Sequence, residues 1–139
     1  MFTYVSIWGV ILATVAAMVI GMLWYAPFMF GKQVQKALNT NDKQMKERQG
    51  AAMVVLISSA LLTAFALSYV TVYVHSYLGG SGLVAGLRAS LIGAIGFGVT
   101  TVFVFGAFDP RETKLLYINA GNRLVTLVAM GLIIGAFVK

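Results

Sequence analysis

Apolar residues occur along this chain in four long runs separated by short polar segments. The runs cover about residues 5–30, 50–74, 83–108 and 115–138. Each exceeds the ~20 residues that a helix needs to cross about 30 Å of hydrocarbon, and all are far longer than the ~10-residue strands of a membrane barrel. Because a helix satisfies its backbone hydrogen bonds within one span, the pattern predicts an all-α bundle of four transmembrane helices in a single domain, residues 1–139.

The charged loops predict how these helices are oriented. The loop between the first two helices and the loop between the last two are basic, whereas the segment 76–82 carries no charge. Since cytoplasmic loops are rich in Lys and Arg, we expect both basic loops in the cytoplasm and both termini outside, and four apolar helices suit an inner membrane. No basic residue precedes the first apolar run, so we do not expect a cleaved signal peptide. The basic loop residues are Lys32, Lys36, Lys43, Lys46, Arg48, Arg111 and Lys114.

The composition excludes several other classes of protein. Of the 139 residues, 60% are apolar and 10% are charged, against about 45–50% and about 25% in soluble domains. Cytoplasmic loops explain the net charge of +6, so we expect no nucleic-acid partner. With no cysteine, one histidine and four carboxylates, we expect neither a metal site nor a cofactor. The hydroxyls at membrane depth have no base at their level, so we expect no enzyme activity.

Small residues recur every four positions in each predicted helix. This spacing places them on one face, where they let helix backbones approach closely in lipid. The same packing serves contacts within a chain and contacts between subunits, and the pattern does not distinguish the two. The series are Gly9, Ala13, Ala17 and Gly21; Ala60, Ala64 and Ser68; Gly82, Gly86, Ser90, Ala94 and Gly98, with Gly93 and Gly96 on neighbouring faces; and Gly131 and Gly135.

One group of polar residues lies inside a predicted span and shares a face of the fourth helix, because its members are three or four positions apart. The group is Asn119, Asn122, Arg123 and Thr126. Arg123 lies about eight residues into this helix, roughly 12 Å deep, so its charge needs a partner. Asp109 and Glu112 are the nearest carboxylates in sequence. Either Arg123 extends to the cytoplasm or to a carboxylate while the asparagines bond across helices, or this face lines a solute path.

Several residues are predicted at the membrane surfaces. Arg88 and His75 lie near the outer ends of their helices, where we expect them to anchor at the interface. Lys32 and Lys36 flank Val34 in the first basic loop, which predicts a short surface helix whose lysines attract anionic lipid. Simple topology signalling also explains these lysines.

Local signals mark two helix boundaries near the first basic loop. Pro27 has no amide hydrogen, which predicts a kink or a helix end there. Asn39 or Asn41 caps the second long helix, with Asp42 at its positive end. Trp24 and Tyr25 are predicted in the inner belt of interfacial aromatic residues.

Two stretches carry a resemblance to a known family. The first is Trp24-Tyr25-Ala26-Pro27-Phe28-Met29-Phe30-Gly31-Lys32, and the second is Ile118-Asn119-Ala120-Gly121 with Leu124-Val125 and Met130-Gly131-Leu132-Ile133. In order and spacing they are similar to the two signatures of the bacterial DUF1761 family of small membrane proteins. The resemblance covers essentially the whole chain; it implies four helices and no particular activity. Members often place His and Trp after the Asn-Ala-Gly stretch, where this chain has Asn122 and Arg123, so no role of that histidine carries over.

Two functions fit these observations. We expect a homo-oligomeric channel or transporter for a small solute such as an anion, because a buried polar face accompanies extended series of small residues. The alternative is a structural or accessory membrane protein that binds lipid or another membrane protein, because paired titratable groups at membrane depth are lacking. The expected partners are thus membrane lipids and further copies of the chain.

Overall fold

The computed structural model describes residues 5–110 and 113–139, and within them the chain is entirely helical apart from its connections. Three of the helical segments, α4, the π-helix η2 and α5, follow one another without a break and form one long apolar helix. The segments are α1 (Ile7–Trp24), α2 (Gly31–Leu38), α3 (Asp42–Leu78), α4 (Gly82–Gly93), η2 (Ala94–Val99), α5 (Thr100–Ala107) and α6 (Thr113–Ala136).

Four helices in the described residues are long and apolar enough to cross a membrane, as predicted. They are α1, α3, the continuous helix Gly82–Ala107 and α6, of 18, 37, 26 and 24 residues. At 1.5 Å per residue even α1 extends about 27 Å, close to the hydrocarbon thickness, whereas α3 extends about 55 Å and exceeds it. The polar first two turns of α3 supply about 12 Å of this additional length.

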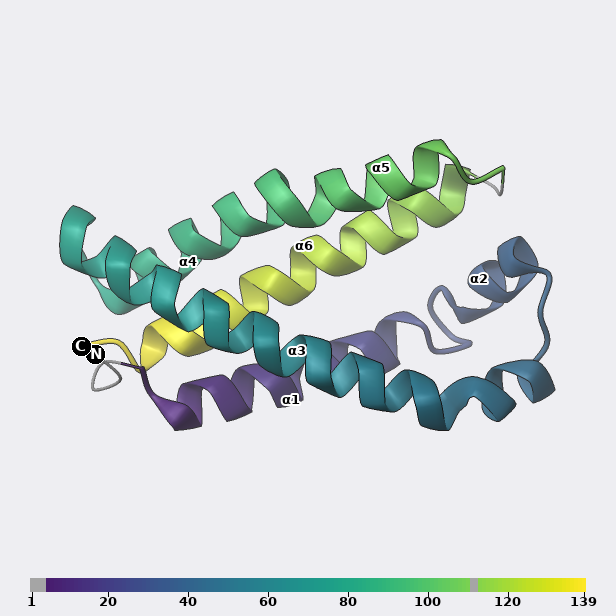
Figure 1. Cartoon of the computed structure of the whole chain (residues 1–139), viewed down its shortest axis with the longest axis horizontal. Helices are drawn as coiled ribbons and strands as arrows, with labels where there is room; N and C mark the ends of the chain where they lie inside the picture. Colours follow the sequence, from purple (N-terminus) through teal and green to yellow (C-terminus); the bar gives the residue numbers. More distant parts are fainter. Residues whose placement is uncertain (1–4, 111–112) are drawn as a thin grey trace.

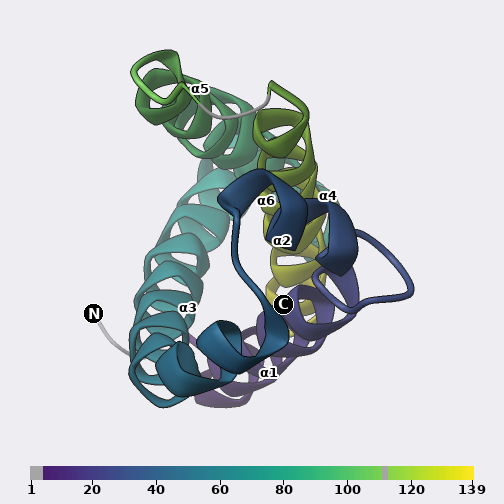
Figure 2. The same ribbon diagram turned by 90° about the vertical axis from the view of Figure 1, so that its right-hand side faces the viewer.

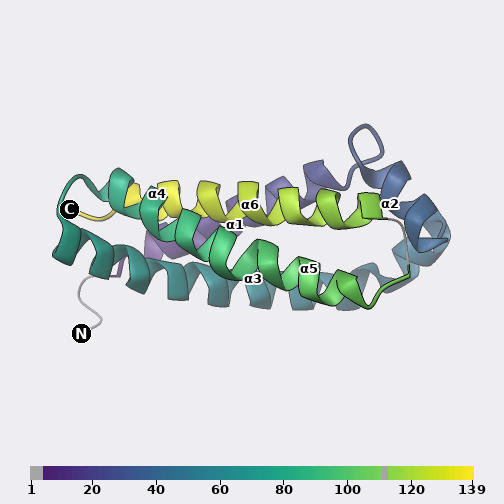
Figure 3. The ribbon, with the colours of Figure 1, turned by 90° about the horizontal axis from the view of Figure 1, so that it is seen from above.

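The helices run along a common long axis, with α6 at the centre of the arrangement (Figure 1). α6 packs against α1, α3, α4, η2 and α5, and α3 also packs against α1 and α4. In the end-on view of Figure 2, α5 and α1 lie on opposite sides of α6. Figure 3 shows the α3–α4 connection and the C-terminus at one end, hereafter the terminal end. α2 lies at the other end, hereafter the basic end.

The first long helix is shorter than its apolar run. α1 ends at Trp24, although the run continues to about residue 30. Pro27 cannot donate to the carbonyl of Leu23, and that carbonyl instead accepts a turn hydrogen bond of 3.3 Å from the amide of Ala26. The predicted boundary at Pro27 is therefore a helix end, and it lets the chain turn into α2.

The second long helix begins at Asp42, ahead of its apolar run, because Asn41 caps it. The Asn41 side-chain oxygen accepts a hydrogen bond of 2.9 Å from the amide of Gln44, and Asp42 lies in the first turn. Asn39 instead ends α2 in the left-handed conformation, with φ of 54°. The predicted capping of α3 by an asparagine is confirmed, and Asn41 supplies it.

The buried core occupies the half of the bundle nearer the terminal end. It is built from small and medium side chains of α1, α3, α4 and α6, because such residues allow the helices to pack closely. Most of the remaining large apolar side chains face outward, as expected of helices surrounded by lipid. The core cluster is Val10, Ala13, Ala64, Leu67, Ala89, Met130 and Ile134.

Glycines of α4 and α6 lie in direct contact within the chain. A Cβ built on Gly86 would overlap the carbonyl oxygen of Gly131 and lie 3.1 Å from the Cα of Gly135. A Cβ on Gly131 would in turn lie 2.5 Å from the hydroxyl of Ser90. These small residues therefore serve packing within one chain. By contrast, Gly21, Gly93 and Gly96 have open space where a Cβ would project.

Candidate functional site

The two stretches that carry the family resemblance lie against each other, although they are far apart in the sequence. The indole nitrogen of Trp24 donates a hydrogen bond of 3.0 Å to the backbone carbonyl of Ile118. The hydroxyl of Tyr25 donates one of 2.7 Å to the side-chain oxygen of Asn119. The Trp24 ring also lies so close to α6 that a Cβ on Gly121 would be 3.0 Å from it. Together these contacts attach the end of α1 to α6.

α2 packs over this attachment at the basic end. Val34 of α2 is buried against Leu115 and Ile118 of α6, with Trp24 and Phe30 packed around them. The Trp24 and Phe30 ring centroids are 5.0 Å apart. The helix predicted in this loop exists as α2, and its apolar face packs on α6.

Tyr25 lies just beyond the end of α1 and is 38% exposed. Partial burial raises the pKa of the Tyr25 hydroxyl above the usual value of 10.0, and the positive charge of Arg123 acts in the opposite direction. The hydroxyl is therefore protonated at neutral pH and acts as the donor to Asn119.

The polar face of α6 contains two buried atoms that lack a hydrogen-bond partner in the described part of the chain. They are the side-chain nitrogen of Asn122 and the hydroxyl oxygen of Thr126. Leaving such a buried group without a hydrogen bond costs about 1–3 kcal/mol of stability. Each is therefore expected to bind a partner in the functional state of the protein. Asn119, one turn before Asn122, already has its oxygen bonded to Tyr25.

Arg123 lies at the exposed edge of this polar face. Its side chain is exposed, and its Cβ is 3.8 Å from the position that a Cβ on Gly98 would take, so it lies beside η2. Arg123 follows Ile118 by five residues and therefore lies about 7–8 Å beyond the level of the Trp24 indole. Arg123 also follows the first residue of α6, Thr113, by ten residues, or about 15 Å along the helix.

The carboxylates proposed as partners of Arg123 lie before α6. Asp109 is half-buried, and its amide donates to the carbonyl of Gly106 at 3.1 Å. Glu112 falls outside the described residues. Pairing of either carboxylate with Arg123 therefore stays a prediction.

The remaining predicted site residues lie away from the polar face of α6. Arg88 is exposed in α4, and Lys32 and Lys36 are exposed on α2. His75 is half-buried in the last turn of α3, near the terminal end, and its Nδ1 is buried without a partner among the described residues. These positions distribute the basic side chains over both ends of the bundle.

Few groups in the described residues are suited to binding a metal ion or to hydroxyl chemistry. Within residues 5–110 and 113–139, no three His, Cys, Asp or Glu side chains gather in a way that would hold a metal ion. The hydroxyls of Ser58 and Thr63 donate to carbonyls of their own helix, at 2.7 and 2.8 Å. Such bonds satisfy a hydroxyl inside a membrane helix without a second helix.

Sequence reasoning assigned Trp24 and Tyr25 only to the belt of interfacial aromatic rings. Their hydrogen bonds to α6 join residues 94 positions apart in the sequence. The spacing of residues within one helix therefore cannot predict them. One indication of this contact is present in the sequence. Trp24 and Tyr25 stand at the start of one family-like stretch, and Ile118 and Asn119 stand at the start of the other. That co-occurrence is consistent with two stretches that pack together.

Four long apolar helices, close glycine packing and a partly buried polar face are the features of a multi-pass helical membrane protein. Residues 8–135 match the family described as "Protein of unknown function (DUF1761)". Since the match covers nearly the whole chain, the protein belongs to the DUF1761 family, which confirms the resemblance seen in the sequence. Comparison with curated proteins and with solved structures gives no match.

Proposed function

We propose that this protein is the subunit of a homo-oligomer that lets a small anionic solute cross a bacterial inner membrane, with its basic end in the cytoplasm. The observation that carries the proposal is the polar face of α6. It combines an exposed arginine with two buried polar atoms, on Asn122 and Thr126, that lack partners in the described chain. Polar groups at membrane depth are costly and are therefore functional candidates.

The path of the solute lies between subunits in this proposal. Within one chain, the core near the terminal end leaves no room, because Ala13, Ala64, Met130 and Ile134 are at most 2% exposed. Arg123 is directed to the surface beside η2, where a neighbouring subunit would enclose it. π-helical segments such as η2 are frequent at functional sites, which supports a role for this surface.

The charge of Arg123 favours an anion. In a site enclosed by subunits, a guanidinium offers five N–H donors and a fixed positive charge, and it rejects cations. Asn122 can donate through the nitrogen that lacks a partner, and the Thr126 hydroxyl can donate as well. All three groups thus suit an oxyanion or a halide.

The oligomeric state is the first test. The protein mass of the particle, measured in mild detergent and in nanodiscs with lipid and detergent subtracted, should correspond to a trimer or a larger ring. A monomer in both media would overturn the proposed path between subunits.

Flux is the second test. Proteoliposomes are assayed for chloride, nitrate and inorganic phosphate, with glycerol as the neutral probe. Arg123→Leu should abolish anion flux, and Arg123→Lys should retain part of it because the charge remains. Arg88→Leu is the matched control, since Arg88 is also exposed but lies near the start of α4. Equal flux for Arg123→Leu and the unaltered protein would exclude Arg123 from a path.

A second candidate function is that of an accessory protein that binds another membrane protein. The surface formed by η2 and α5 favours it, because Phe97, Phe105 and Phe108 are strongly exposed and no residue of α5 is buried. A partner of this kind would co-purify in fixed stoichiometry and would cross-link to α5 in cells. Absence of any cross-linked partner, together with anion flux by the pure protein, would reject this alternative.

A further inference from the structure

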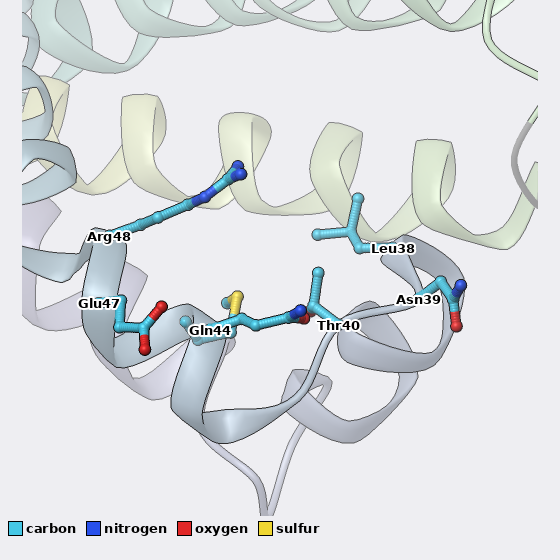
Figure 4. Close-up of a pocket in the computed structure, with 7 residues that line it drawn as sticks. Leu38, Asn39, Thr40, Gln44, Glu47 and Arg48 are labelled. Atoms are coloured by element: carbon cyan, nitrogen blue, oxygen red, sulfur yellow. The ribbon is translucent and has the colours of Figure 1, made fainter.

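A cavity of about 520 Å³ lies at the basic end, between the end of α2 and the start of α3 (Figure 4). Arg48 and Gln44 extend from α3 toward the α2 side of the cavity, where Leu38 and Thr40 lie. The lining thus combines polar, charged and apolar side chains. Its residues are Leu38, Asn39, Thr40, Gln44, Met45, Glu47 and Arg48.

Three groups of this lining lack a partner in the described part of the chain. The hydroxyl oxygen of Thr40 is buried and makes no hydrogen bond. The carboxylate of Glu47 and the guanidinium of Arg48 are adjacent in sequence, and both side chains are without an ion pair among the described residues. A cavity that presents one positive charge, one negative charge and an unused hydroxyl is suited to a ligand that carries both charges.

The cavity lies at the level of lipid headgroups. The apolar run of α3 begins at about residue 50, so Arg48 lies about 3 Å outside it and Asp42 about 12 Å outside. The headgroup region on each side of a bilayer is roughly 5–8 Å thick. Glu47 and Arg48 therefore face the layer in which phosphates and amines of phospholipids occur, and Leu38 and Met45 are apolar surface next to it.

We propose that this cavity binds the ammonium–phosphate headgroup of a phosphatidylethanolamine-type phospholipid. Arg48 binds the phosphate by charge-assisted hydrogen bonds, and the Thr40 hydroxyl and the Gln44 amide donate to its oxygens. Glu47 accepts hydrogen bonds from the primary ammonium. The proposal rests on the membrane class of the protein and is independent of solute transport.

The chemistry of the lining separates this headgroup from others. A quaternary ammonium has no N–H to donate to Glu47, and it is bound by aromatic rings, which the lining residues do not supply. A headgroup with only negative charge would be repelled by Glu47. Of the common headgroups, the primary ammonium with its phosphate satisfies both charged side chains.

Lipid retention tests the proposal. The full-length protein is placed in nanodiscs with equal amounts of phosphatidylethanolamine, phosphatidylcholine and phosphatidylglycerol, then extracted gently, and the retained lipid is identified by native mass spectrometry. Phosphatidylethanolamine should be enriched about tenfold over each of the others, as one charge-assisted hydrogen bond implies. Equal retention of the three lipids, or enrichment of phosphatidylglycerol, would overturn the proposal.

Substitutions of Glu47 and Arg48 test the role of each charge in lipid binding. Glu47→Gln should remove the preference for phosphatidylethanolamine over phosphatidylglycerol, and Arg48→Gln should lower retention of all three lipids about tenfold. Lys46→Gln is the matched control, because Lys46 is exposed on the same turn of α3 but does not line the cavity. All three positions are exposed, so the variants should unfold at the same temperature as the unaltered protein. An equal loss of lipid in the Lys46→Gln protein would indicate that surface charge alone retains the lipid. That result would contradict a specific headgroup-binding site in the cavity.

A soluble compound with the same chemistry is the other source of such a ligand. Phosphoethanolamine added to delipidated protein separates the two sources. Weak binding that competes with the lipid supports a headgroup site, whereas binding at least as tight as that of the lipid would overturn the assignment to a phospholipid.

Discussion

The indole nitrogen of Trp24 bonds to the carbonyl oxygen of Ile118 at 3.0 Å, and so joins the last residue of α1 to the second turn of α6. α1 ends there because Pro27 follows, and without this bond its end would be held by the Tyr25–Asn119 hydrogen bond and by apolar contacts. The bond also fixes where Arg123 lies along α6 relative to the Trp24 ring, about 7–8 Å beyond it.

Replacing Trp24 by Phe should destabilise the protein. The substitution removes the hydrogen bond to Ile118 and part of the ring that lies on Gly121, so the free energy of unfolding should fall by at least about 1 kcal/mol. Denaturation in mixed micelles measures it. Trp8→Phe is the control, because Trp8 is 66% exposed and should leave the unfolding free energy nearly unchanged. Equal effects of the two substitutions would argue against the attachment of α1 to α6.

The glycine contact between α4 and α6 predicts a contrast between two Gly→Ala substitutions. Gly86→Ala should cost about 1–3 kcal/mol, because its methyl group would overlap the backbone of Gly131, which cannot rotate away. Gly93→Ala should be neutral or stabilising by up to about 1 kcal/mol, because it has open space and alanine favours a helix. Thermal unfolding of both variants measures the difference. A Gly86→Ala protein as stable as the Gly93→Ala protein would show that the two helices do not pack this way.

Removal of the Thr126 hydroxyl should raise the stability of the protein and lower its anion flux. Thr126→Val keeps the shape but removes a buried hydroxyl without a partner in the described chain, so stability in detergent should rise by about 1–3 kcal/mol while anion flux falls. Thr71→Val is the control, since the buried Thr71 hydroxyl donates to the carbonyl of Leu67 at 2.8 Å. That variant should change stability by less than about 1 kcal/mol. A destabilised Thr126→Val protein would mean that the hydroxyl has a partner in the resting protein.

The start of α3 predicts different roles for two asparagines. Asn41→Ala removes the cap of Gln44 and should weaken the first turns of α3 by about 0.5–2 kcal/mol, seen as faster amide exchange over residues 43–47. Asn39→Gly should not weaken them, because glycine adopts the left-handed conformation of Asn39 without strain. Similar exchange in the two variants would be inconsistent with capping by Asn41.

These asparagines also show what the sequence could not decide. Asn39 and Asn41 are both residues that cap helices, and the sequence alone left them as alternatives. The backbone decided between them, since Asn41 is extended while Asn39 is left-handed. The cavity beside them escaped sequence reasoning altogether, because it forms where the end of α2 and the start of α3 come together in space. Arg48 entered the sequence analysis only as a loop charge.

The sequence by itself determined the membrane class, the four apolar helices and the family, because the length and hydropathy of a span depend only on the residues within it. The tertiary structure decided which glycines touch, which polar atoms on α6 lack partners and what Trp24 binds. Those outcomes depend on how each helix is rotated and crossed against its neighbours. Many small contacts across the whole bundle set that rotation together, and no single stretch of sequence contains it.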